Sequence, residues 1–189
     1  MIDCKDNITS CIIQNTIPQA AEMPYALYQS LQGKYYVGYA ADVKFDDNHY
    51  GWAGLVNPSH SCVNLHVYVW TVTNFGSYPL TAQIWFNTQV PEDATISDFI
   101  TPANTAICPL PRPRVKILQA NYVDNTPPCG DKIFERQVQP EVTIVGEENG
   151  CFIFPPGGSF SVLLINTEVT NKSGIANVAF GWYEEAIHK

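Results

Sequence analysis

Positive charge is scarce in this chain, and its scarcity excludes whole classes of function. Only 10 of the 189 residues are Lys or Arg, and the formal net charge is −8. Nucleic acids and anionic lipid surfaces attract basic patches, so we expect no nucleic-acid partner. The chain also has no run approaching the roughly 20 apolar residues that a transmembrane helix needs. We therefore expect no membrane partner either.

Catalytic motifs are missing as well. The chain has no Gly-x-Ser-x-Gly elbow, no P-loop and no Gly-x-Gly-x-x-Gly fingerprint. Its adjacent acid pairs are Glu147 with Glu148 and Glu184 with Glu185. They do not suit glycoside hydrolysis, because neighbouring strand residues point to opposite faces. Solvated charges at a turn and a strand end are the better interpretation, and we predict no enzyme activity, no catalytic residue and no cofactor.

Histidines supply the best metal candidates. They are His49, His60 and His66, with Asp46 or Asp47 as an additional ligand. Their spacing fits no compact ligand pattern on a single element. His66 is better interpreted as an ordinary solvent-facing side chain, so we predict no metal site.

Strand-forming sequence, interrupted by turn residues, fills most of the chain. Fourteen prolines and twelve glycines stand mainly between apolar runs and oppose long helices. Short helical turns are predicted only at residues 24–32 and 93–100. The pattern predicts an all-β fold, an antiparallel β-sandwich or jelly roll of about 8–10 strands. The predicted strands are residues 35–41, 52–56, 63–74, 80–87, 105–108, 115–123, 142–145, 151–154, 159–166 and 175–184.

The clearest strand is predicted at residues 63–74, where side chains alternate between two faces. One face is apolar and the other mixed. The apolar face holds Val63, Leu65, Val67 and Val69, and the opposite face holds Asn64, His66, Tyr68 and Trp70.

Residues 1–23 differ from the rest and are predicted to form an N-terminal connector arm, with residues 24–189 as the sandwich domain. The run from Ile8 to Ile17 is rich in β-branched residues and favours a strand. The isoleucines of this run also fit one face of a helix, although Thr and Asn weaken that alternative. The isoleucines are Ile8, Ile12, Ile13 and Ile17.

Six cysteines occur in a chain whose start, Met-Ile-Asp-Cys-Lys-Asp-Asn, lacks the features of a secretory signal. No two of them form a Cys-x-x-Cys pair, which argues against a zinc knuckle and a redox motif. Either they are small buried hydrophobic residues, or the protein meets oxidising conditions without export through a signal peptide. Burial is a poor explanation for Cys4 and Cys11, because the predicted arm has no hydrophobic core in which a thiol could be buried. The cysteines are Cys4, Cys11, Cys62, Cys108, Cys129 and Cys151.

These observations lead to a hypothesis of self-assembly. The arm adds as a strand to an exposed sheet edge of another copy, docking through Ile8, Ile12, Ile13 and Ile17. Cys4 and Cys11 then form disulfides between subunits, and a contact that does not close a ring gives a helical polymer. The candidate partners are the body cysteines Cys62, Cys108, Cys129 and Cys151. Six cysteines allow 15 connectivities, so the pairing stays open.

Several motifs resemble an uncharacterised family from spore-forming Gram-positive bacteria, over residues 24–185. They include Trp-Ala-Gly-Leu-Val-Asn-Pro at residues 52–58, Phe-Pro-Pro-Gly-Gly-Ser-Phe at residues 154–160 and Val-Ala-Phe-Gly-Trp at residues 178–182. That resemblance implies a β body and no established activity. A cysteine-bearing connector before a jelly roll is also similar in plan to endospore appendage pilins. This likeness implies a filament subunit, extracellular or on the spore surface, that is released from the producing cell.

A carbohydrate-binding or adhesive module is the alternative function. Aromatic residues make up 12% of the chain, and sugar-binding faces use aromatic rings as stacking surfaces. A sandwich core uses aromatic residues too, so the composition alone does not decide between the two. The candidate stacking residues are Tyr68, Trp70, Trp85 and Tyr122.

Overall fold

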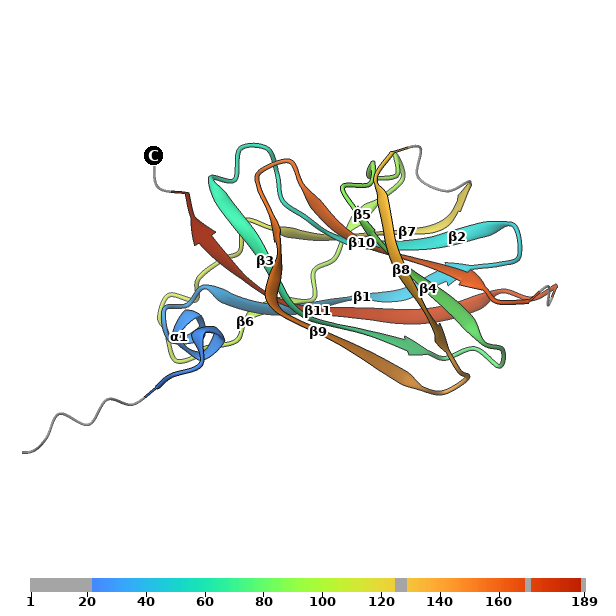
Figure 1. The fold of residues 1–189 in the computed structure, drawn as a ribbon, viewed down its shortest axis with the longest axis horizontal. Coiled ribbons are helices and arrows are strands. Elements are labelled where there is room, and N and C mark those ends of the chain that lie inside the picture. Colours follow the sequence, from blue (N-terminus) through green and yellow to red (C-terminus); the bar gives the residue numbers. More distant parts are fainter. Residues whose placement is uncertain (1–21, 125–128, 169–170, 188–189) are drawn as a thin grey trace, which may run out of the picture.

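The structure, a computed structural model, describes residues 22–124, 129–168 and 171–187. A short helix, α1 (Tyr25–Leu31), precedes the strands. Figure 1 shows that the long strands are stacked in two layers, with α1 at one end of them. The strands are β1 (Tyr35–Phe45), β2 (His49–Val56), β3 (Val63–Asn74), β4 (Leu80–Phe86), β5 (Thr95–Ile96), β6 (Ile100–Pro102), β7 (Lys116–Asp124), β8 (Asp131–Val138), β9 (Thr143–Phe154), β10 (Ser159–Asn166) and β11 (Gly174–Ala186).

The two layers are antiparallel sheets. One has five strands in the order β6-β1-β11-β3-β9, and the other has six in the order β5-β7-β2-β10-β4-β8. Their inner faces contribute to one hydrophobic core, as expected of a sandwich. The predicted all-β antiparallel β-sandwich is therefore confirmed.

Individual elements agree with the sequence prediction in part. The strands predicted at residues 63–74 and 159–166 coincide with β3 and β10, and the helical turn at residues 24–32 is α1. Two predictions are wrong, because residues 105–108 form a turn and bend, and residues 93–100 contain β5 and the start of β6 in place of a helical turn. The prediction also omitted β8. Four of the eight residues of β8 are charged, so it lacks the apolar alternation of a half-buried strand.

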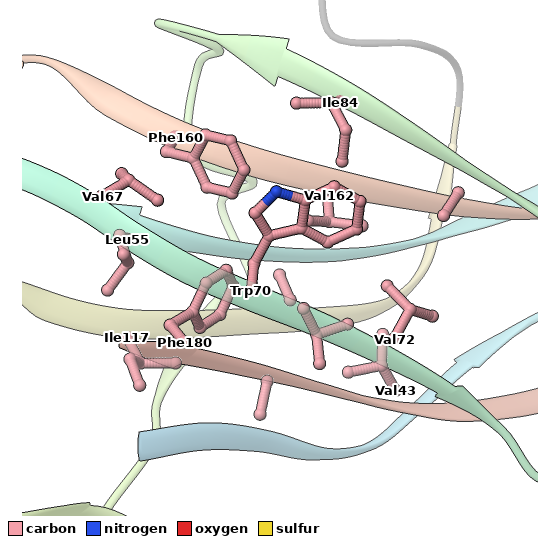
Figure 2. Packing of buried hydrophobic residues seen from close by; sticks show 14 of the residues in the cluster. Val43, Leu55, Val67, Trp70, Val72, Ile84, Ile117, Phe160, Val162 and Phe180 are labelled. Carbon is pink, nitrogen blue, oxygen red and sulfur yellow. The ribbon is translucent and has the colours of Figure 1, made fainter. Parts of the chain in front are cut away.

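Trp70 lies at the centre of the core between the two sheets (Figure 2). Its side chain is 1% exposed, and its ring centroid lies 6.3 Å from that of Phe160 on the opposite sheet. Its indole Nε1 donates a hydrogen bond of 3.0 Å to Glu148 Oε1, which satisfies its polar atom. The largest side chain of β3 is thus a core anchor.

A bulge in β3 changes the alternation predicted for residues 63–74. Tyr68 is an extra residue where β3 pairs with β11, so the register shifts at this point. Beyond it, Trp70 and Val72 point into the core, and Val69 lines the outer face. The prediction that Val69 shares the face of Val67, with Trp70 opposite, is therefore wrong.

One long side of the sandwich is closed by side chains of β7. The Gln119 amide accepts a hydrogen bond from the Ala41 N–H (3.0 Å) and donates one to the Ala41 carbonyl (2.8 Å). Asn121 Oδ1 accepts a hydrogen bond from the Lys44 N–H (2.8 Å). These side chains satisfy backbone groups of β1 that have no strand beside them. The other long side is bordered by β9 in one sheet and β8 in the other.

Candidate functional site

The predicted arm lies almost entirely outside the described residues, which begin at residue 22. The assignments of its cysteines and isoleucines therefore stay predictions. These residues are Cys4, Cys11, Ile8, Ile12, Ile13 and Ile17. The two described arm residues, Glu22 and Met23, are exposed and lead into α1.

The four body cysteines carry free thiols on the surface. Cys62, Cys108, Cys129 and Cys151 are all exposed. The interpretation of these four residues as small buried hydrophobic side chains is therefore wrong. Surface thiols add nothing to the core, and they remain open to oxidation and to disulfide exchange.

Strand register brings many chain segments to one end of the sandwich, which we call the arm end. It is the end at which β1 begins, directly after α1. The last residue of β11, Ala186, lies opposite Val63 at the start of β3. In the other sheet, the end of β2 at Val56 pairs with the start of β10 at Ser159 and with the start of β7 at Lys116.

Three of the four body cysteines lie near this arm end. Cys62 immediately precedes β3, and Cys108 lies in the segment between β6 and β7. Cys151 lies three residues before the end of β9. The sequence could not indicate this grouping, because these residues are far apart in the chain and antiparallel register alone brings them together. Cys129 lies apart from them, two residues before β8 and only five residues after Asp124, which is at the opposite end of the β2–β7 ladder.

Helix α1 contacts the five-stranded sheet through Tyr25. The Tyr25 hydroxyl donates a 2.9 Å hydrogen bond to Glu185 Oε1, and its ring lies 5.6 Å from that of Tyr183. Tyr183 is so close to Gly150 that a Cβ on Gly150 would lie 2.3 Å from the tyrosine Oη. Burial, followed by the charges of Tyr25, Glu185 and Cys151, raises the pKa of Tyr183. The start of α1 therefore lies beside the Gly150–Cys151 part of β9.

The outward side of α1 is apolar and uncovered within the described part of the chain. Gln29 is the helix residue that is buried, whereas Leu27 and Leu31 are each about half exposed. Met23 and Tyr28 are exposed to a similar extent. A contiguous apolar patch of this kind is typical of a contact surface.

Strand β9 is a long free edge of the five-stranded sheet. It has twelve residues and pairs with β3 alone. The sequence predicted two strands here, at residues 142–145 and 151–154; the structure joins them through a bulge that contains Asn149 and Gly150, both with positive φ. Val145 and Ile153 are more than half exposed on this strand, as is typical of a surface that a partner covers.

Glu184 is the one predicted solvated charge that proves to be buried. It is 6% exposed, and its carboxylate accepts 3.0 Å hydrogen bonds from the backbone N–H groups of Arg114 and Val115. The Trp182 indole donates to it as well, at 3.3 Å. Burial raises the pKa of Glu184, and these hydrogen bonds oppose the increase. Glu184 thus fixes the end of the Cys108-bearing segment, while Glu185 points away toward Tyr25.

The predicted metal candidates lie apart. His49 Nδ1 lies 2.8 Å from Asp46, whereas His66 is on another sheet, stacked on Tyr183 at 4.5 Å. His66 is 7% exposed, so its interpretation as a solvent-facing residue is wrong. Among the described residues, no three His, Cys, Asp or Glu side chains are grouped to hold a metal ion.

The aromatic residues considered for sugar stacking do not form one surface. Trp70 is enclosed in the core, so its assignment as a stacking residue is wrong. Tyr68 lies on the five-stranded sheet, where its ring contacts Tyr35 at 5.6 Å. Trp85 and Tyr122 lie on β4 and β7 of the other sheet. These residues therefore offer no shared platform for a sugar.

An apolar groove of about 640 Å³ lies on the outer face of the five-stranded sheet. Its floor is formed by β1, β11 and β3, where Ala179 and Gly181 keep the surface low. Phe99 forms part of its wall and stacks on Tyr39 at 4.7 Å. Asp98 is its one ionisable acid, so the groove offers contact area rather than catalytic groups.

Comparisons with known proteins identify a family but no activity. Residues 10–189 match a family of unknown function, DUF6143, so the match also covers part of the predicted arm. No curated protein and no solved structure is detectably similar. Within the described residues, no helix has the length and hydropathy that crossing a membrane requires. The chain belongs to the DUF6143 family, whose function is unknown.

Proposed function

We propose that this protein is a structural subunit that assembles with copies of itself into an extracellular or spore-surface filament. The arm of one subunit adds as a strand to a sheet edge of another, and disulfides between subunits make the joint permanent. The observation that carries the proposal is the set of four exposed free thiols, Cys62, Cys108, Cys129 and Cys151, of which all but Cys129 lie near the arm end.

Exposed thiols without metal ligands around them support a cross-linking role. The described part of the chain contains no grouped metal ligands, and no two body cysteines pair with each other. An exposed free thiol is open to oxidation and to disulfide exchange. Four such thiols in one small domain would react unspecifically unless they form defined disulfides. Cys4 and Cys11 on the arm would supply two such partners.

The surface around the thiols also supports assembly. The β1–β7 side of the sandwich is closed by Gln119 and Asn121, whereas the β8–β9 side is open. An open sheet edge accepts an added strand through main-chain hydrogen bonds. The exposed apolar side of α1, at Leu27 and Leu31, adds contact surface next to the arm.

The plan of a cysteine-bearing connector before a β body is similar to that of endospore appendage pilins. The likeness supports assembly outside the producing cell, where oxidants act on the thiols.

The test is electrophoresis of the full chain after incubation with oxidised and reduced glutathione. We expect a ladder of multimers without reductant and a single 21.0 kDa band with it. The Cys4→Ser/Cys11→Ser double variant is expected to remain at the monomer position in both lanes. A monomer band in both lanes for the wild-type chain, or an unchanged ladder in the double variant, would contradict the proposal.

A further inference from the structure

We propose that the acceptor edge is β9 and that Cys11 of one copy pairs with Cys151 of the next. This inference rests on the proposed function and specifies its joint. The arm strand runs antiparallel to β9, with residues 12–16 beside Thr143–Glu147 of a second copy. The joint is then head-to-tail.

The choice of β9 follows from a comparison of the sheet edges. The edge strands β5 and β6 have two and three residues, which is too short to hold an arm. β8 is longer, but four of its eight residues are charged, and charged edge residues oppose strand addition. The straight part of β9, Thr143–Glu147, carries a single charge and exposes Val145.

The bulge in β9 defines where Cys151 lies along this edge. Residues Thr143–Glu147 pair with β3 without interruption. From Glu147 to Phe152, β9 advances five residues while β3 advances two, so three residues of β9 are extra. A strand added beside Thr143–Glu147 that continues straight therefore meets Cys151 one position beyond Glu147.

The register of the arm follows from this geometry. When residues 12–16 pair antiparallel with Thr143–Glu147, Cys11 comes opposite Cys151. Opposite residues in an antiparallel pair have Cα atoms about 4.5–5.5 Å apart, within the range of about 4.4–6.8 Å that a disulfide spans. A parallel arm with the same cysteine pair would instead place Asp6 and Asn7, outside the strand-forming run, on this edge.

The direction of the arm identifies its source as a second copy. An antiparallel arm leaves β9 at Thr143, which is the end of the strand opposite the arm end. The acceptor's own arm begins at the arm end, where Tyr25 contacts Tyr183 beside Gly150. If the acceptor's own arm followed the β9 strand of the same copy, it would run parallel to that strand, and Cys11 would lie far from Cys151. Each copy thus donates from one end and accepts at the other, which propagates an open filament.

The chemistry is a two-step thiol–disulfide exchange with a disulfide oxidant, such as oxidised glutathione. The Cys11 thiolate attacks the oxidant and releases one glutathione thiolate, forming a mixed disulfide. The Cys151 thiolate then attacks the Cys11 sulfur and releases the second glutathione. Two cysteines are oxidised to one disulfide, one glutathione disulfide is reduced to two thiols, and the two cysteine protons pass to the released thiolates.

The test uses equal amounts of full chain labelled with ¹⁴N and with ¹⁵N, mixed while reduced and then oxidised with glutathione. Mass spectrometry of a digest without reductant identifies the linked peptides. We expect the Cys11–Cys151 linkage with about half of it carrying mixed isotopes, because partners in an assembly combine at random. The same linkage without mixed isotopes would show docking within one chain and overturn the inference.

Failure of the inference and failure of the proposed function differ in this experiment. Linkages between copies that join Cys11 to Cys62, Cys108 or Cys129 would overturn the inference and leave the filament intact. No linkage between copies would overturn both. The Cys151→Ser variant is expected to lose the Cys11 linkage, and Cys62→Ser is its matched control and is expected to keep it.

The strand pairing is tested separately with proline in the arm. Ile13 lies inside the proposed paired stretch and Ile8 outside it, and both precede the residues that the structure describes. Proline removes one ladder hydrogen bond and restricts the backbone, so Ile13→Pro is expected to slow formation of the Cys11–Cys151 linkage about tenfold. Ile8→Pro is expected to leave the rate unchanged. Equal rates for the two variants would contradict the proposed register.

Discussion

Removal of the Glu184 carboxylate is expected to destabilise the arm end strongly. In Glu184→Ala, the backbone N–H groups of Arg114 and Val115 and the Trp182 indole lose their acceptor. A buried donor without a partner costs about 1–3 kcal/mol. Water can enter part of the space left by the side chain and can satisfy some of these donors. We therefore expect the free energy of unfolding to fall by about 3–5 kcal/mol in total. For a domain of this size, that corresponds to a decrease in Tm of roughly 10 °C.

Thermal unfolding followed by near-ultraviolet circular dichroism at neutral pH, with reductant present, measures this loss. The neighbouring variant Glu185→Ala is the matched control, because Glu185 is partly exposed and gives up its hydrogen bond from Tyr25 and its 3.2 Å contact with His66 Nε2. We expect that variant to lose about 1 kcal/mol, well below the loss in Glu184→Ala. Equal losses in the two variants would refute the assignment of Glu184 as a buried acceptor.

The same residue predicts a dependence on pH. Burial raises the pKa of Glu184 above its ordinary value of 4.5, so the folded chain binds this proton more tightly than the unfolded chain does. Its titration therefore adds stability that is fully present below pH 4.5 and is lost as the pH rises through the folded pKa. Compared with Glu184→Gln, which cannot titrate, the wild-type chain should be relatively more stable at low pH than at neutral pH. A wild-type advantage that grows with pH would contradict this.

Three further predictions concern the thiols, the core and the closed edge. In Cys4→Ser/Cys11→Ser, an aromatic disulfide reagent should titrate four thiols per native chain, and fewer would show that a body cysteine is buried. Trp70→Ala should cost about 3–5 kcal/mol in urea unfolding, against under about 1.5 kcal/mol for the half-buried Trp85→Ala; similar losses would contradict the core position of Trp70. Gln119→Ala should cost about 1–2 kcal/mol and speed hydrogen exchange at the Ala41 amide, and unchanged exchange there would show that Gln119 does not close this edge.

The fold class could be predicted because its signals are local. Prolines and glycines separate short β-prone runs, and this pattern located β3 and β10 at their observed bounds. Edge strands carry weaker signals, because water covers one or both of their faces. The charged sequence of β8 therefore has no apolar alternation, and the short strands β5 and β6 depend on pairing with neighbouring strands.

Bulges account for the errors in side-chain direction. The extra residue Tyr68 reverses the faces of β3 beyond it, so Trp70 enters the core although simple alternation predicts the opposite. In β9, Glu147 and Glu148 are predicted to lie in a turn between two strands, directly before the Asn149-Gly150 pair. The structure uses the positive φ of Asn149 and Gly150 for a bulge within one strand. Pairing with neighbouring strands determines whether such residues form a turn or a bulge, and the local sequence does not show it.

The candidate site could be predicted only as a set of cysteines. Sequence composition identified six thiols without a metal motif, but exposure depends on tertiary packing, and the grouping of Cys62, Cys108 and Cys151 depends on antiparallel register. Glu184 shows the same limit, because its partners Arg114 and Val115 are about 70 residues away in the chain. Contacts of such long range leave no local pattern.

Electron microscopy of the full chain tests the central claim most directly. The protein is negatively stained at micromolar concentration after oxidation with glutathione disulfide, and again after it has been kept in reductant throughout. The account predicts filaments of uniform width in the oxidised sample, and their absence from an oxidised Cys4→Ser/Cys11→Ser sample that has been washed in mild denaturant. Isolated particles alone in the oxidised wild-type sample would contradict it.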